Sequence, residues 1–211
     1  MRPSVWYETA KMIAEDYRGG AAVREREAAW WAAEGHPFSE VIERAGRARM
    51  ANGQRHPHQR RLTSAAIDGC VTALAAIAPA LEETTRFHEL HELVQRAFKP
   101  VYGAGELAVY DAADHICERL GHVSEHIIYL HAGARVGARR LFGGRIPRGD
   151  AWGIFITQVP EGFREFSTHE IEDILCLYKD DFLLTPDQLL AKWEGGSVVR
   201  CTLPAGSRPS C

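Results

Sequence analysis

The chain lacks the cysteine and hydrophobic patterns of disulfide-stabilised or membrane-spanning proteins. Its five cysteines, in 211 residues, are an odd number, and no two form a Cys-x-x-Cys pair. This argues against a disulfide framework and against a structural zinc site. The longest nearly uncharged run, Val71 to Leu81, contains Pro79 and is too short to cross a bilayer. The N-terminal residues have no apolar signal core. We therefore expect a cytoplasmic protein with no membrane partner.

The signature motifs of several enzyme classes are missing as well. The sequence has no phosphate-binding Gly-x-x-x-x-Gly-Lys loop, no Gly-x-Ser-x-Gly motif and no His-Glu-x-x-His motif. Gly103-Ala104-Gly105 lacks the third glycine of a dinucleotide fingerprint and follows a helical pattern rather than a strand. We expect no cofactor and no bound metal.

The chain has no net positive charge, but its arginines are concentrated in two stretches. The net charge is −3, and only four lysines are present, so the chain as a whole lacks the basic signature of nucleic-acid-binding proteins. Residues 44–61, however, hold six arginines and no carboxylate, and residues 135–148 hold five more arginines and no carboxylate. A planar guanidinium can pair two phosphate oxygens at once, so both stretches are typical of phosphate contact. The alternative is a solvated basic surface.

The hydrophobic periodicity predicts a mostly α-helical protein, a multi-helix bundle. Helices are expected near residues 4–19, 21–35, 38–45, 63–78, 85–99, 106–120, 132–141, 168–178 and 186–193, with a loop at 50–61 and one extended segment at 152–159. Pro79 is expected to stop the fourth helix, and capping boxes at Ser167 and Thr185 to open the last two. No linker is visible, so we expect a single helical domain over residues 1–194 and a flexible tail over 195–211.

The segment Lys99–Leu107 joins two of these helices by a short glycine turn. Apolar residues recur at helical spacing on both sides of it, at Phe87, Leu90, Val94 and Phe98, and at Val109, Ala112, Ala113, Ile116 and Leu120. Two helices joined in this way form a helical hairpin, whose glycines permit positive φ and close backbone approach. The second helix then presents its unbonded N–H groups and its positive dipole end to a phosphate. These features are those of a helix-hairpin-helix element, a nucleic-acid-binding motif.

Three segments together resemble the helix-hairpin-helix DNA glycosylase superfamily, over about residues 38–145. They are Val101-Tyr102-Gly103-Ala104-Gly105, the apolar pair Ile128-Tyr129, and Arg135-Val136-Gly137-Ala138-Arg139. The resemblance implies a DNA-glycosylase-like fold, contact with DNA, and base-excision or lyase chemistry in DNA repair. The position of the family's catalytic lysine holds Leu107, and that of its catalytic aspartate holds Leu130, next to His131.

Asp111 and His131 are the candidate catalytic residues. Asp111 lies less than two helical turns from the expected phosphate-binding end of its helix. It shares a helix face with Asp114, His115, Glu118 and His122, which could form an acid/base pair or part of a metal site, or could simply be solvated. His131 stands at a helix start, where it could donate to a phosphate or a leaving base, or bond locally to the backbone.

The leading hypothesis is a DNA-binding protein that grips one phosphate with its hairpin. The expected binding residues are Gly103, Gly105 and Glu106, through their N–H groups, and Arg55, Arg60, Arg61, Arg135 and Arg139 around them. In the alternatives the hairpin is only architectural, and the protein is a helical interaction module or a small-molecule enzyme with its site between the hairpin and the Ser167 helix. A metalloenzyme built on His88, His91, Asp111 and His115 is a third possibility, and Asp173 is an alternative catalytic carboxylate. The sequence says nothing of the oligomeric state.

Overall fold

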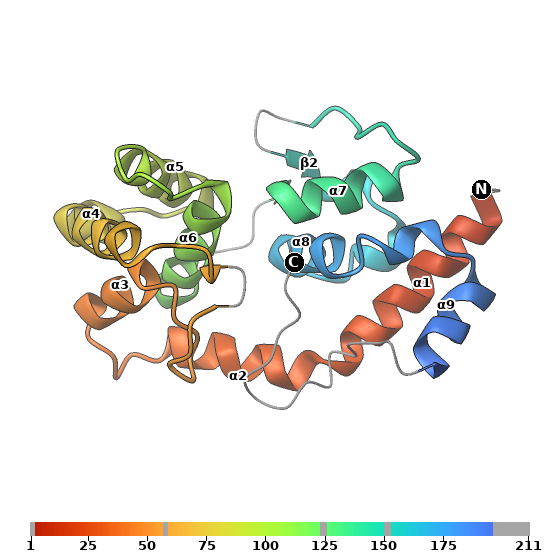
Figure 1. Cartoon of the computed structure of the whole chain (residues 1–211), viewed down its shortest axis with the longest axis horizontal. Helices are drawn as coiled ribbons and strands as arrows, with labels where there is room; N and C mark the ends of the chain where they lie inside the picture. The colour runs from red at the N-terminus through yellow and green to blue at the C-terminus, as the bar shows by residue number, and fades with distance from the viewer. Residues whose placement is uncertain (1–2, 57–58, 123–125, 150–152, 196–211) are drawn as a thin grey trace. The chain divides into compact units, whose positions relative to one another are not determined.

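The computed structural model of the chain describes residues 3–56, 59–122, 126–149 and 153–195, and these are mostly helical (Figure 1). Its packing divides the chain into two compact units. One, here called the hairpin unit, holds the described residues of Val23–Glu125. The other, the sheet unit, holds those of Met1–Ala22 and His126–Pro204. A single domain over 1–194 stays a prediction, because compact units can belong to one domain. The predicted tail, apart from Gly195, lies outside the described residues.

The hairpin unit is an arrangement of four helices with α2 (Ala21–Ala32) leading into it. α3 (Phe38–Gly46) packs on α4 (Ser64–Glu82) and on α6 (Glu106–Leu120), while α5 (Phe87–Phe98) packs on the same two helices. The side chains between them are fully or almost fully buried, among them Ile42, Leu74, Leu81, Leu90, Val94 and Ile116. The predicted helices around residues 38–45, 85–99 and 106–120 are therefore confirmed.

The turn between α5 and α6 rests on the first two turns of α4. Gly103 has a φ of +94°, which favours glycine, and a Cβ placed on it would lie 3.6 Å from the Cβ of Ala66. A Cβ on Gly69 would lie 2.9 Å from Cγ1 of Val101. Small residues of α4 thus allow the turn to lie close against that helix. As a result, the N-terminus of α6 lies near the N-terminus of α4.

The sheet unit contains four helices and a two-stranded sheet. Its helices are α1 (Pro3–Gly19), α7 (Ala132–Leu141), α8 (Thr168–Leu177) and α9 (Pro186–Glu194), with three short 3₁₀ turns between them, Ile156–Gln158, Glu161–Phe163 and Asp181–Leu183. β1 (Ile127–Tyr129) runs antiparallel to β2 (Gly153–Phe155), with Ile128 opposite Ile154. α7 crosses α8 so closely that a Cβ on Gly137 would lie 1.8 Å from the carbonyl oxygen of Leu175. A continuous apolar core fills the unit, with Ile13, Tyr17, Ile128, Phe163 and Ile174 completely buried.

Both predicted capping boxes are confirmed. The Ser167 hydroxyl accepts from the backbone N–H of Glu170 at 3.2 Å, and the Glu170 carboxylate accepts from the N–H of Ser167 at 2.9 Å. Thr185 and Gln188 make the same reciprocal pair at 3.3 and 2.9 Å. These bonds open α8 and α9 at the predicted residues.

The prediction that Pro79 ends the fourth helix is wrong. α4 continues through Pro79 to Glu82. The ring removes one hydrogen bond, to the carbonyl of Ala75, but both residues are exposed, so water can satisfy that carbonyl. The predicted extended segment at 152–159 also differs: only Gly153–Phe155 is a strand, a 3₁₀ turn follows, and residue 152 lies outside the described residues.

Within the described part of the chain, α4 alone is long and apolar enough to cross a membrane, judged by length and composition. The mean hydropathy of its 18-residue window is 1.6, and 28% of that window is buried inside the protein. The core helix of a soluble protein passes the same test. The expectation of a cytoplasmic protein without a membrane partner stays a prediction.

Candidate nucleic-acid interface

One end of the hairpin unit brings together the N-termini of two helices. Gly103, two residues before the N-cap residue Gly105 of α6, lies against Ala66 in the first turn of α4. Thr63 caps α4 by accepting from the N–H of Ala66 at 3.1 Å, whereas Gly105 caps α6 without a side chain. The first N–H groups of a helix have no partner within the helix and carry its positive dipole end. We call this surface, formed by the described residues of 47–63 and by residues 99–106, the loop end.

The loop from α3 to α4 brings arginines to the same end. The Gln59 side chain donates to Oδ2 of Asp111 at 2.7 Å, which fixes the loop on the second turn of α6. Arg60 and Arg61 follow directly, are exposed, and make no ion pair with any residue that the structure describes. Arg55 is exposed too, and its Nη1 donates to the carbonyl of Leu62 at 3.3 Å.

The structure therefore brings six of the eight predicted binding residues to one unit. Arg55, Arg60 and Arg61 share the loop end with Gly103, Gly105 and Glu106. Arg135 and Arg139 belong to α7 of the sheet unit. Arg135 donates to the carbonyl of Leu130 at 2.6 Å, so part of its hydrogen-bonding capacity serves the fold.

Two further features of the α5–α6 turn bear on ligand binding. The Tyr102 side chain at its tip is 98% exposed, which sequence reasoning did not single out. An exposed aromatic ring is the group that stacks on unpaired bases. Glu106 is also exposed and lies in the first turn of α6, where its charge complements the helix dipole but opposes a phosphate.

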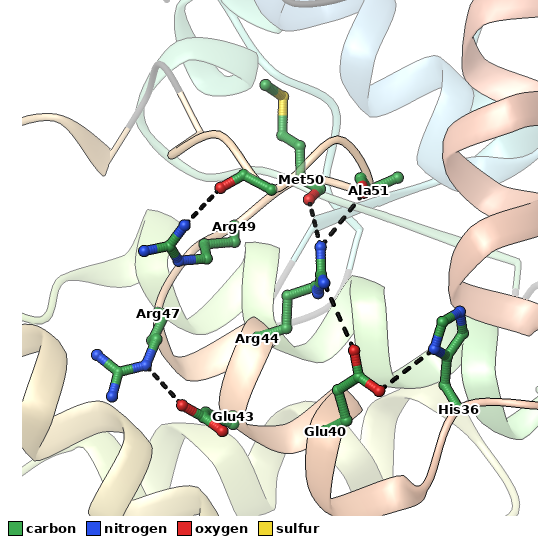
Figure 2. A network of polar contacts seen from close by, with 9 residues as sticks. His36, Glu40, Glu43, Arg44, Arg47, Arg49, Met50 and Ala51 are labelled. Atoms are coloured by element: carbon green, nitrogen blue, oxygen red, sulfur yellow. Dashed lines mark hydrogen bonds and ion pairs between the residues drawn. The ribbon is translucent and has the colours of Figure 1, made fainter.

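Two arginines of the 44–61 stretch serve the fold itself (Figure 2). Arg44 donates to the carbonyls of Met50 and Ala51 at 3.2 and 3.3 Å, and its guanidinium lies 4.0 Å from the centre of the Trp30 ring. Arg47 pairs with Glu43 at 2.9 Å. Within the described residues, the remaining four arginines of the stretch have no carboxylate partner. These are Arg49, Arg55, Arg60 and Arg61.

Asp111 and His115 lie inside the hairpin unit, so the solvated-face alternative is wrong for them. The Asp111 side chain is 12% exposed, and its Oδ2 lies 3.9 Å from Nδ1 of His56. His115 is 6% exposed and stacks on Trp31, with ring centres 4.1 Å apart and planes 9° from parallel. The reason is long-range: Trp31 and the loop at His56 cover this part of α6, while Glu118 stays exposed.

His131 is buried at the start of α7 and faces Glu172 on α8. Its Nε2 lies 2.5 Å from Oε1 of Glu172, and both side chains are about 5% exposed. No local signal in the sequence links these two residues, which lie 41 positions apart. Asp173 accepts from the Tyr17 hydroxyl at 3.2 Å. The two candidate catalytic residues, Asp111 and His131, therefore belong to different units.

The residues of the metalloenzyme alternative do not form a metal site in the described structure. His91 is buried with its ring 5.8 Å from that of Phe87, and His88 pairs with Glu92 at 3.3 Å. Across the described ranges, no three His, Cys, Asp or Glu side chains are placed to hold a metal ion.

The pKa values of Glu89, Asp180 and Cys70 are displaced from their ordinary values, each with a clear cause. Hydrogen bonding from Arg86, at 2.7 Å, and from the Thr85 backbone holds the pKa of Glu89 at about 2. Hydrogen bonding from Arg140 lowers the pKa of Asp180. Burial raises the pKa of the Cys70 thiol to about 11.

Comparison of the chain with protein-family models, with curated proteins and with solved structures finds no match. Any function must therefore be argued from the residues and the geometry of the two units.

Proposed function

We propose that the hairpin unit binds DNA through its phosphate backbone at the loop end. The observation that carries the proposal is the meeting of the α4 and α6 N-termini, at Ala66 and Gly103, on the loop end that also bears Arg60 and Arg61. Helix N–H groups and guanidinium groups are the two kinds of donor that proteins use for phosphates.

In this proposal each group has a separate role. The N–H groups around Gly103 and Gly105 hold one phosphate, because glycine lets the nucleic acid approach the backbone closely. Arg60 and Arg61 neutralise neighbouring phosphates, and Arg55 extends the positive surface. None of these contacts reads a base, so we expect binding with little sequence preference and a strong dependence on salt.

Base-excision or lyase chemistry is the finer proposal, from the resemblance to the helix-hairpin-helix glycosylases. Such chemistry needs a carboxylate or an amine at the sugar. Asp111 is the carboxylate to test, because it lies on α6 of the same unit, in the second turn from the proposed phosphate grip. His131 belongs to the sheet unit and is held by Glu172, which favours a role in the fold.

Gly105 offers a sharp test of binding. A Cβ on Gly105 would meet no atom within 4 Å, and its φ of −100° suits any residue, so the site accepts a side chain. Gly105→Glu places a negative charge at the grip, while Gly105→Gln is the matched neutral control. We expect the Glu variant to bind a fluorescein-labelled duplex at least about tenfold more weakly than the Gln variant, from charge alone.

The salt dependence tests the arginines. Measured by fluorescence anisotropy between low and moderate KCl, the double variant Arg60→Gln/Arg61→Gln should reduce the slope of log K against log salt by about 1.8, roughly 0.9 for each phosphate contact. Wild-type protein that binds no duplex even at low salt would overturn the proposal and leave the hairpin architectural, in a helical interaction module or a small-molecule enzyme.

The chemistry is tested separately, on duplexes containing a damaged base or an abasic site. Product formed by wild type and by His131→Ala but not by Asp111→Asn would assign excision to the hairpin unit. Binding without product would make the protein a DNA-binding module alone.

A further inference from the structure

A small pocket opens in the loop that follows α3. Its volume is about 280 Å³, and it is lined by Arg47, Arg49, Gly53, Gln54, Arg55 and Ile67. Pockets for drug-sized ligands run from roughly 300 to 1,000 Å³, so this one suits a small group. Three of its six lining residues are arginines, and none is acidic.

The loop that forms the pocket has an ordered backbone. Met50 donates to the carbonyl of Gln54 at 2.8 Å, and His56 donates to the carbonyl of Ala48 at 2.7 Å. Between these bonds, Arg49 and Arg55 pair as directly opposite residues of an antiparallel bridge. The positions of both arginines are therefore set by main-chain hydrogen bonds.

Opposite placement of two arginines is unfavourable without an anion. Like charges directly opposite each other on antiparallel strands destabilise the pairing. Arg49 donates to the carbonyl of Gly53 at 2.6 Å, and Arg55 to that of Leu62, and neither lies within ion-pair distance of a carboxylate in the described part of the chain. Arg47, by contrast, is paired with Glu43 and lies 3.6 Å from Asp68.

We propose that this pocket binds a phosphate monoester, with the phosphate held between Arg49 and Arg55. A monoester carries close to two negative charges at neutral pH, which match the two unneutralised guanidinium groups. Each guanidinium has five N–H donors, and the carbonyl bond of each occupies one of its nitrogens, so donors remain for the phosphate oxygens. The terminal phosphate of a nucleic-acid strand and a small phosphorylated metabolite share this chemistry.

The first experiment uses inorganic phosphate as the probe and thermal unfolding as the measurement. Phosphate at about ten times its Kd should raise the Tm of the whole protein by roughly 3–6 °C relative to chloride at equal ionic strength. Arg49→Gln and Arg55→Gln should lose this shift. Arg26→Gln removes an equal charge from an exposed position of α2 and should keep the shift.

A second variant guards against loss of folding. Gln54→Glu adds a carboxylate to the pocket without removing an arginine, and the Gln54 side chain is exposed. We expect this variant to fold as wild type does and to lose the phosphate-induced shift. A shift that persists in Gln54→Glu, or no shift in wild type, would overturn the proposal.

Two competition experiments then distinguish a strand end from a small metabolite as the source of the phosphate. A preference of about tenfold for a 5′-phosphorylated over a 5′-hydroxyl duplex would identify a strand end, because a charge-assisted hydrogen-bond pair discriminates at about this level. No preference, with competition by adenosine monophosphate, would identify a small metabolite. Gly105→Glu separates this site from the proposed DNA grip, because Gly105 does not line the pocket. The variant should weaken duplex binding and keep the part of the phosphate-induced shift that Arg49→Gln removes.

Discussion

Replacing Gly137 by alanine would push a methyl group into the backbone of α8. The new Cβ would lie 1.8 Å from the carbonyl oxygen of Leu175 and 2.6 Å from its carbonyl carbon. Because ordinary contacts of a Cβ begin near 3.4 Å, α7 and α8 would have to separate by roughly 1.5 Å, in a core packed as densely as a crystal. Overpacking of this kind costs about 1–3 kcal/mol or more, and the better helix propensity of alanine returns up to about 1 kcal/mol.

We therefore expect Gly137→Ala to lower the free energy of unfolding by about 2 kcal/mol, and Tm by about 4–8 °C. Urea and thermal unfolding followed by circular dichroism measure both. Gly162→Ala is the matched control in the same unit, since a Cβ at Gly162 would meet nothing within 4 Å; it should leave stability unchanged or raise it by up to about 1 kcal/mol. Equal stability of the two variants would show that α7 and α8 do not cross at Gly137.

Three further predictions concern local chemistry. Ala48, just after α3, is the one non-glycine residue with positive φ (+51°) in the described ranges, a conformation that strains an alanine backbone. Ala48→Gly should therefore raise the free energy of unfolding in urea by about 0.5–1 kcal/mol. A lower free energy of unfolding in the variant would show that this backbone is not strained. With its pKa near 11, the Cys70 thiol is only about one part in a thousand ionised at pH 8, so it should react slowly with a disulfide reagent. Native protein and Cys70→Ser should therefore show the same number of fast-reacting thiols. Arg86→Gln should raise the pKa of Glu89 from about 2 toward its ordinary value in an NMR titration. Since the folded pKa lies below the unfolded one, the stabilisation by Glu89 is present at neutral pH and is lost as the pH falls toward 2, so the two proteins should converge in stability in acid.

The sequence predicted well those features that depend on neighbouring residues. The capping boxes at Ser167 and Thr185 are confirmed because both partners lie three residues apart. The α5–α6 hairpin follows from apolar periodicity on both sides of a glycine turn. Pro79 shows the limit of local rules: whether a proline ends a helix depends on whether the freed carbonyl meets water, which only the packing decides.

The candidate site depended on contacts that no local pattern encodes. The polar face of α6 looks solvated in sequence, yet His115 is covered by Trp31, 84 residues earlier in the chain. The sequence shows residues 44–61 only as one arginine-rich stretch. In the structure some of these arginines hold the loop, such as Arg44, and others have no carboxylate partner among the described residues, such as Arg49. That division follows from where carboxylates and carbonyls lie in space, and composition cannot supply it.

A single carboxylate oxygen links the pocket loop to a natural chromophore. Oε1 of Glu27 accepts the indole N–H of the fully buried Trp31 at 3.0 Å and the backbone N–H of Ala51 at 2.8 Å. Ala51 belongs to the same turn whose carbonyls Arg44 binds. Any movement of that turn changes the hydrogen bond of the indole, and tryptophan emission responds to such changes. The hairpin unit thus carries its own optical reporter, so the arrival of an anion in the pocket can be followed by stopped-flow fluorescence without an attached label.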